Sequence, residues 1–454
     1  MIDFGPLSAR DDADLLKYFH KTDQANDLVQ FRTPKSDFLF VARPGAGKTA
    51  LVRRLESEVW GGRCLKITPD RFRVSDPTGR LNPADLRLIL SSELLALVIS
   101  DIAEKSADGG DIQKACKSFS GGTWKKITRK FFGKELKGLT ILGCGFTLKE
   151  AARLDYVSEL RSSRFEEEAE SFLREWRSEI RLVLVMDDPE LIVSEGFDSL
   201  TPENAARIGV LFSVLTSLHG SGVRIAAMLR EHVLEAVRSQ YENFQHFSDR
   251  ISGLQWGEDD LLDLLKLRVR VRMEKKWGEV FAESEAVFQD EVFPYLVDGP
   301  RDLLFLCNSA VKRALPISIT EIRRYLRPLR SQKVTEIGKR HRSHWPGIDR
   351  FCVSVIEILK QQFPEGRFPN GAVTEEFEQA FSDPGSPIGL LRTSKKMGWL
   401  DLVRWDSPKA DEILFAVGCL GYVENGRVQY AWSGRSLEAF RGAEEHLLSP
   451  LFRL

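Results

Sequence analysis

The clearest structural signal in the chain is FLFVARPGAGKTAL at residues 38–51. Its first four residues form a short continuous apolar run, which is typical of a strand buried on both faces of a parallel sheet. A glycine-containing turn follows directly, and apolar residues then recur at helical spacing at Ala50, Leu51, Leu55 and Val59. Strand, turn and helix in this order predict a P-loop.

The turn closely follows the phosphate-binding pattern G-x-x-x-x-G-K-[ST], with Ala42 in place of the first Gly. In such a loop, backbone N–H groups and the helix N-terminus meet phosphate oxygens. The Lys neutralises phosphate charge and the hydroxyl holds Mg²⁺. Because glycines remain where backbone freedom matters most, Ala42 is a mild departure. The residues expected to bind the nucleotide are Arg43, Pro44, Gly45, Ala46, Gly47, Lys48, Thr49 and Ala50.

Further apolar runs predict strands at 63–68, 181–186, 222–229 and 251–256, with a helix at about 202–218. Strands that alternate with helices indicate an α/β fold with a parallel sheet. The segment from about 71 to 178 is mostly helical in pattern, and its first helix begins at Asn82-Pro83. We interpret this segment as an insertion in the P-loop domain.

Two carboxylates end the clearest buried strand, in Met186-Asp187-Asp188. A Walker B element has this form, because an apolar run delivers a carboxylate to the edge of the sheet beside the P-loop. Asp187 is expected to bind Mg²⁺ together with Thr49, and Asp188 to polarise the attacking water, with Glu190 in reserve. The alternative, a turn or a helix cap, is less fitting after a P-loop.

Two arginines are candidate sensors of the terminal phosphate. Arg230 ends the strand next to the Walker B strand, where a guanidinium makes bidentate phosphate contacts. Arg301 opens a predicted helix and is a candidate second sensor. The alternatives are a surface arginine at 230 and, at 301, a helix start that is only capped by Asp302.

The chain divides by pattern into a P-loop core at 1–260, a helical lid with a basic linker at 261–342, and a C-terminal module at 343–454. The lid helices are predicted at 261–273 and 283–315, and the module helices at 348–363, 374–381, 388–397 and 412–420. Asn425-Gly426 predicts a type I′ hairpin after them, so the module resembles a winged helix. The linker from Arg323 to Arg342 is either a phosphate-tracking surface or a solvated helix face.

The amino-acid composition argues against several classes of protein. Lys+Arg and Asp+Glu nearly cancel at 65 and 66, so any nucleic-acid contact would be local. The six cysteines are scattered, which argues against a zinc site or a disulfide framework. The first residues lack a signal-peptide pattern and no apolar run is long enough to span a bilayer, so we expect a cytoplasmic protein.

Taken together, these stretches resemble the bacterial STAND/KAP-related P-loop ATPases, which belong to the AAA+-like ASCE class. The resemblance covers about residues 10–320. It rests on Leu15 to Phe19, Ala42 to Leu51, Leu182 to Asp188, Met228 to Glu231, Gly253 to Trp256 and Gly299 to Leu304.

The resemblance implies ATP and Mg²⁺ as cofactors, with Lys48 and Thr49 at the phosphates and the metal. It also implies Asp187 and Asp188 in Walker B, Arg230 as the first sensor and Arg301 as the second. Such proteins are commonly nucleotide-driven switches, and many act in anti-phage defence. The Walker B pair is Asp-Asp rather than Asp-Glu, which predicts slow turnover.

Three functions compete: an ATP-hydrolysing switch, a DNA-associated ATPase with a winged helix, and a nucleotide-dependent scaffold without hydrolysis. For the C-terminal module we favour a protein partner or self-association over DNA, because its hairpin holds only Arg427 as a basic residue. The expected docking face comprises Trp399, Phe415, Tyr422 and Trp432.

Overall fold

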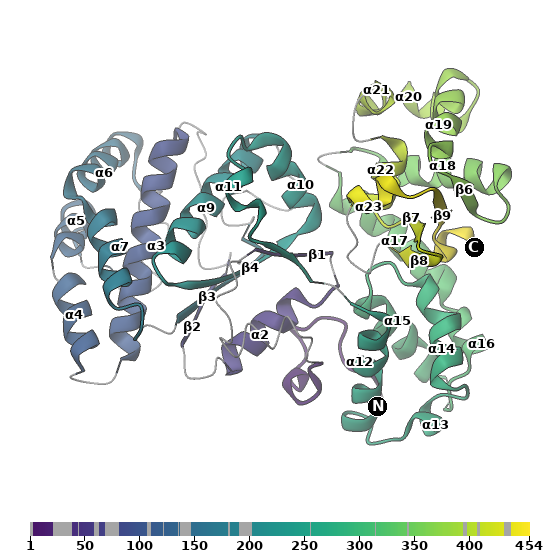
Figure 1. Ribbon diagram of the computed structural model, residues 1–454, viewed down its shortest axis with the longest axis horizontal. Coiled ribbons are helices and arrows are strands. Elements are labelled where there is room, and N and C mark those ends of the chain that lie inside the picture. The colour runs from purple at the N-terminus through teal and green to yellow at the C-terminus, as the bar shows by residue number, and fades with distance from the viewer. Residues whose placement is uncertain are drawn as a thin grey trace. The chain divides into compact units, whose positions relative to one another are not determined.

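A computed structural model describes residues 3–20, 39–43, 45–58, 63–68, 81–106, 110–120, 122–134, 136, 147–179, 182–189, 202–254, 256–313, 315–342, 345–393, 397–405, 409–430 and 437–454. The chain forms two compact units, whose helices and strands are labelled in Figure 1. The sheet unit comprises Asp23–Val41 and Leu51–Ser252. The C-terminal unit comprises Met1–Thr22, Ala42–Ala50 and Gly253–Leu454.

The sheet unit contains a five-stranded parallel sheet in the order β2-β3-β4-β1-β5. The predicted α/β class with a parallel sheet is therefore confirmed. Because the strands are parallel, β1, β3 and β4 present their carboxyl ends at one edge. The strands are β1 (Leu39–Ala42), β2 (Arg63–Ile67), β3 (Leu182–Asp187), β4 (Arg224–Arg230) and β5 (Ile251–Gly253).

Burial on both faces explains the apolar runs of the strands. β3 is buried along its whole length, and its alternate residues Leu182, Leu184 and Met186 join one core with the helices of the unit. The helices are α2 (Lys48–Glu58), α3 (Pro83–Lys105), α4 (Asp111–Ser120), α5 (Thr123–Phe132), α6 (Glu150–Ser163), α7 (Phe165–Glu175), α9 (Pro202–Gly220), α10 (Glu231–Gln240) and α11 (Gln245–Ser248).

The segment predicted to be mostly helical contains α3 to α7. Its first helix begins where the sequence indicates, because Asn82 accepts a hydrogen bond from the backbone N–H of Asp85 at 2.9 Å and Pro83 occupies the first turn. Figure 1 shows α4 and α5 on the outer side of α3, away from the sheet. No helix among the described residues combines the length and apolar character needed to cross a membrane.

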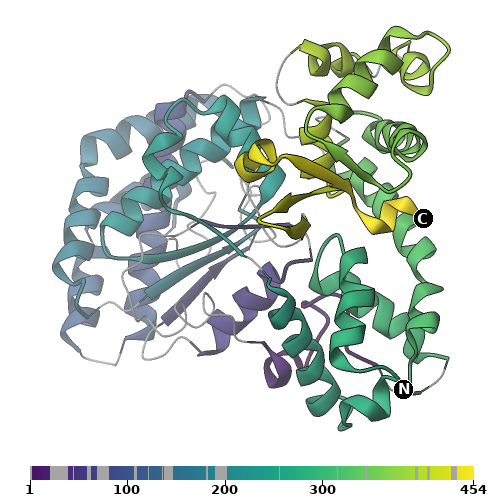
Figure 2. The ribbon, with the colours of Figure 1, turned by 45° about the vertical axis from the view of Figure 1, so that its right-hand side comes forward.

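The C-terminal unit is mostly helical and carries a four-stranded antiparallel sheet in the order β6-β9-β7-β8, drawn in green to yellow in Figure 2. The strands are β6 (Arg367–Pro369), β7 (Leu420–Glu424), β8 (Arg427–Tyr430) and β9 (Glu445–Leu448). The helices are η1 (Leu15–Tyr18), α12 (Glu258–Val271), α13 (Trp277–Val280), α14 (Glu285–Val292), η4 (Phe293–Tyr295), α15 (Pro300–Val311), α16 (Ile319–Arg323), α17 (Leu326–Arg340), α18 (Ile348–Gln362), α19 (Ala372–Ser382), α20 (Pro387–Arg392), α21 (Trp399–Trp405), α22 (Ala410–Ala416), α23 (Leu437–Gly442) and α24 (Pro450–Arg453).

The hairpin prediction is confirmed, because β7 and β8 pair around Asn425 and Gly426, both with positive φ. Three predicted helices have clearly different bounds. The one expected at 388–397 is the shorter α20, which ends at Arg392. The helix expected at 283–315 is divided into α14, η4 and α15, because Pro294 and Gly299-Pro300 interrupt it. The helix expected at 412–420 ends at Ala416, and Leu420 already begins β7.

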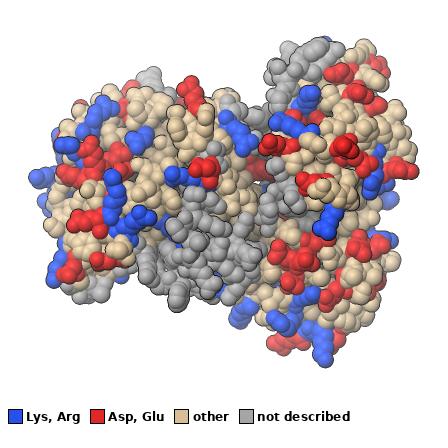
Figure 3. All heavy atoms as spheres, in the orientation of Figure 1, with Lys and Arg blue, Asp and Glu red and all other residues tan. Residues whose placement is uncertain are grey.

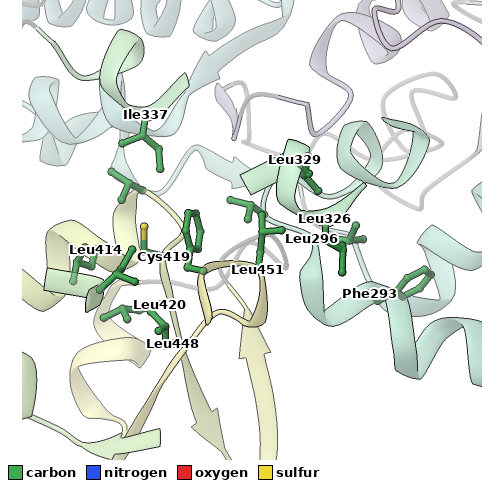
Figure 4. Close-up of a cluster of buried hydrophobic side chains, with 14 of the residues drawn as sticks. Phe293, Leu296, Leu326, Leu329, Ile337, Leu414, Cys419, Leu420, Leu448 and Leu451 are labelled. Atoms are coloured by element: carbon green, nitrogen blue, oxygen red, sulfur yellow. The ribbon is translucent and has the colours of Figure 1, made fainter. Parts of the chain in front are cut away.

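One apolar core runs through the C-terminal unit, from the helices predicted as a lid to the C-terminal strands. In Figure 4, which shows part of it, Phe293, Leu296, Leu326 and Leu329 lie at one side, Leu414, Leu420 and Leu448 at the other, and Leu451 between the two groups.

The docking face expected for the C-terminal module was partly wrong. Phe415 and Tyr422 are buried in the core of the unit. Trp399 is half-buried and donates a hydrogen bond to the carbonyl of Pro346 at 3.0 Å. Trp432 lies outside the described residues. Aromatic residues of this module therefore stabilise its own core.

Candidate functional site

The predicted P-loop is a turn between β1, which ends at Ala42, and α2, which begins at Lys48. Gly45 and Gly47 have φ of +89° and +92°, values that glycine adopts readily and other residues rarely. Lys48 is buried, and its ammonium donates hydrogen bonds to the carbonyls of Ala42 at 2.8 Å and Arg43 at 3.0 Å. Its positive charge is thus held within the turn.

The structure describes most of the other residues that were predicted to bind the nucleotide. Ala46, Thr49 and Ala50 are half-buried, with Thr49 and Ala50 in the first turn of α2. Pro44 lies outside the described residues.

Two segments of the C-terminal unit pack against the turn. The indole N–H of Trp256 donates to the carbonyl of Ala46 at 2.8 Å. A Cβ atom added to Gly45 would lie 2.9 Å from Cβ of Arg301 and 3.1 Å from the carbonyl oxygen of Asp298. Glycine at 45 is therefore required by its neighbours as well as by its φ. Arg301, the candidate second sensor, begins α15 directly against the turn.

The predicted Walker B residues lie at the end of β3 in the sheet unit. Asp187 is its last residue and Asp188 follows with φ of +53°, and both are buried. Arg230 ends the neighbouring strand β4, where Asp187 pairs with Met228. This register brings the Arg230 guanidinium to Asp188, to which it donates a hydrogen bond at 3.2 Å. The reserve candidate Glu190 lies outside the described residues.

A buried ion cluster supports the segment that walls the P-loop turn. The ammonium of Lys333, on α17, lies 2.7 Å from a carboxylate oxygen of Asp298 and 2.5 Å from one of Asp302. Arg340, which follows Lys333 on the same face of α17, lies 3.0 Å from Asp298. Glu336 stands between the two cations, 3.4 Å from Lys333. The cluster thus ties the start of α15 to α17.

The charges of this cluster compensate one another inside the core. Lys333 and Asp302 are each 1% exposed. Burial alone would raise the pKa of Asp298, but Lys333 and Arg340 outweigh it and hold this pKa below its usual range. Burial alone would likewise lower the pKa of Lys333, and Asp302 and Asp298 raise it on balance. The sequence signal for this cluster was the spacing of 333, 336 and 340, which puts three charged side chains on one helix face.

The basic linker is largely neutralised by acidic neighbours. Arg323 is paired with Glu291, Arg324 with Glu321 at 3.2 Å, and Arg330 with Glu357 at 3.5 Å. Lys333 and Arg340 belong to the buried cluster. Most of the basic residues in this stretch therefore form ion pairs within the C-terminal unit.

Arg43 of the P-loop turn reaches the C-terminal module. Its guanidinium donates a hydrogen bond to the carbonyl of Phe415, near the end of α22, at 2.9 Å. A Cβ atom added to Gly418 would lie 2.7 Å from Nη1 of Arg43, so the guanidinium also needs a glycine in the turn after α22. The sequence contains no pattern for this contact, because the two residues are far apart along the chain.

By fold, the chain is an α/β protein with a five-stranded parallel sheet. Neither a protein-family model nor a curated protein matches its sequence.

Replacing Lys333 by Met is expected to lower the free energy of unfolding by about 3–5 kcal/mol, because the buried carboxylates of Asp298 and Asp302 lose their nearest cation. Urea denaturation of the intact protein, followed by circular dichroism, measures the change. Lys339→Met, an exposed position on the same helix, is the control. Equal stability of the two variants would contradict a structural role for the cluster.

Proposed function

We propose that this chain is an ATP-binding P-loop ATPase of the ASCE class that acts as a nucleotide-driven switch. The observation that carries the proposal is the turn between β1 and α2, with Gly45 and Gly47 at positive φ and Lys48 buried at the helix start. Such a turn aims successive backbone N–H groups into a concave anion site, and the helix dipole favours the same negative charge.

The order of the strands supports the same class. β4 lies between β1, which leads into the turn, and β3, which ends in Asp187. In the ASCE class, too, a further strand separates the P-loop strand from the Walker B strand. Ligands of open parallel sheets bind beyond the carboxyl ends of the strands, and β3 and β4 end in Asp187 and Arg230.

The residues fit a magnesium–nucleotide complex by chemistry. The Thr49 hydroxyl and the Asp187 carboxylate are oxygen ligands of the kind that Mg²⁺ prefers, and Lys48 would neutralise the phosphates. When bound, ATP and Mg²⁺ supply the phosphoryl group and the charge that offsets its negative oxygens. The choice of ATP over GTP rests on the family resemblance.

Asp188 is the candidate that polarises water, and Arg230 positions it. A general base needs an oriented carboxylate, and the guanidinium at 3.2 Å favours one orientation of the Asp188 side chain. In this role Arg230 acts through Asp188, in addition to the phosphate contact expected of a sensor. Asp is shorter than the Glu common at this position, which favours slow turnover.

The switch rests on the contact between Arg43 and Phe415. Arg43 stands inside the P-loop turn, and Phe415 lies near the end of α22 in the C-terminal module. A change of the turn on nucleotide binding would therefore alter a charge-assisted hydrogen bond to α22. A two-state response of this kind requires only that ATP binds one arrangement of the turn more tightly than the other.

Lys48→Ala is expected to abolish ATP binding or weaken it by orders of magnitude, because a phosphate site loses its principal compensating charge. Calorimetric titration with ATP and Mg²⁺ tests this, with Lys66→Ala, a half-buried lysine of β2, as the control. Unchanged affinity in Lys48→Ala would mean that the turn is a structural feature only.

Asp188→Asn is expected to keep ATP binding and lower turnover at least about tenfold, or about 1.4 kcal/mol of barrier, because the amide no longer accepts a proton. Single-turnover hydrolysis measures the rate. If Glu190→Gln loses the activity and Asp188→Asn keeps it, the roles are reversed. A wild-type protein that binds ATP without hydrolysing it would favour the scaffold function.

Arg43→Ala is expected to uncouple α22 from the nucleotide. Hydrogen exchange of residues 410–416 should respond to ATP in the wild type and lose most of this response in the variant, since a hydrogen bond to a charged group contributes about 1.5–3 kcal/mol. Arg427→Ala, on the exposed hairpin turn, serves as the control. A response that persists in Arg43→Ala while ATP still binds would contradict the coupling.

A further inference from the structure

The segment that contains α4 and α5 in the sheet unit concentrates positive charge. Residues 111–134 hold seven basic residues and one acidic residue, Asp111, in a chain whose net charge is −1. The basic residues are Lys114, Lys117, Lys125, Lys126, Arg129, Lys130 and Lys134. No role in nucleotide binding uses them, and the resemblance to P-loop ATPases does not rest on them.

The two helices turn their apolar side chains inward and most of these cations outward. On α5, Trp124 and Ile127 are buried while Lys126, Arg129 and Lys130 are exposed. On α4, Cys116 is buried and Lys114 and Lys117 are exposed. In Figure 3 blue side chains project at the left edge, where Figure 1 places α4 and α5, and red side chains lie near them.

Some of these cations form no ion pair with the carboxylates that the structure describes. Lys130 is paired with Glu159 of α6, and Lys114 lies 3.9 Å from Asp111. In the part of the chain that the structure describes, no carboxylate forms an ion pair with Lys126 or Lys134. This face therefore differs from the basic linker, whose arginines are largely matched by glutamates of the same unit.

We propose that the exposed face of α4 and α5 binds the phosphodiester backbone of a nucleic acid. Several cations on neighbouring helix turns, about 5.4 Å apart along the axis, suit a ligand with regularly repeated negative charge. An anionic membrane is the less fitting partner, because the aromatic side chains face inward. Phe119 stacks on Phe172 with ring centres 5.1 Å apart, and Phe131 and Phe132 pack edge-on against Tyr156.

This binding is independent of the proposed ATPase, since the residues involved lie outside the P-loop turn. It is a backbone contact and carries no sequence preference. Each phosphate that the face neutralises should add about 0.9 to the slope of log affinity against log salt. DNA and RNA share this chemistry, so both are probes.

The experiment is a fluorescence-anisotropy titration of the full chain on labelled duplexes of about 20 base pairs, one DNA and one RNA, over a range of salt. The test variant combines Lys114→Glu, Lys126→Glu and Lys134→Glu. The matched control combines Arg323→Glu, Arg324→Glu and Arg327→Glu, three exposed linker positions with the same change in net charge. Lys48→Ala is titrated in parallel.

We expect the wild type, the linker variant and Lys48→Ala to bind at least one duplex with a steep salt dependence. The α4–α5 variant should lose at least about tenfold in affinity at low salt, and its slope should fall by about 2–3. Three outcomes would overturn the proposal: no binding by the wild type at low salt, a loss confined to the linker variant, or binding to phosphatidylserine vesicles but to neither duplex. Circular dichroism checks that each triple variant is folded.

Discussion

A buried cation, Lys333 of α17, holds the start of α15 in the C-terminal unit. Its ammonium has no access to water, and it is stable there only because Asp298 and Asp302 lie within ion-pair distance. Separating α17 from the start of α15 would leave charges of both signs buried and uncompensated, at a cost of several kcal/mol. The turn from Asp298 to Arg301 is therefore held in one place.

The P-loop turn depends on that placement. Gly45 has no room for a side chain because Arg301 and Asp298 stand against it, and Trp256 holds the next residue through the carbonyl of Ala46. Arg43 continues the contacts to the end of α22. A rearrangement of the turn would therefore be transmitted to the C-terminal module through Arg43.

Much of the fold could be predicted, because local sequence patterns reflect the burial and the backbone conformation of neighbouring residues. The apolar runs of β1, β3 and β4 announce strands buried on both faces, and Asn82-Pro83 marks the start of α3. Asn425-Gly426 specifies a tight hairpin because both positions need positive φ. Helix bounds were less certain where prolines interrupt an apolar pattern, as between α14 and α15.

The residues of the candidate site fall into two groups, those that local patterns predict and those whose contacts depend on folding. Local patterns alone predict a glycine turn with Lys48 and Thr49 after one strand and a carboxylate pair after another, since both are properties of contiguous residues. The contacts of Arg230 with Asp188, of Trp256 and Arg301 with the turn, and of the linker arginines with acidic neighbours became visible only in the folded chain. The physical reason is that a charge or a hydrogen-bonding group acquires its role from the partner that folding brings to it, and such partners lie far away in the sequence.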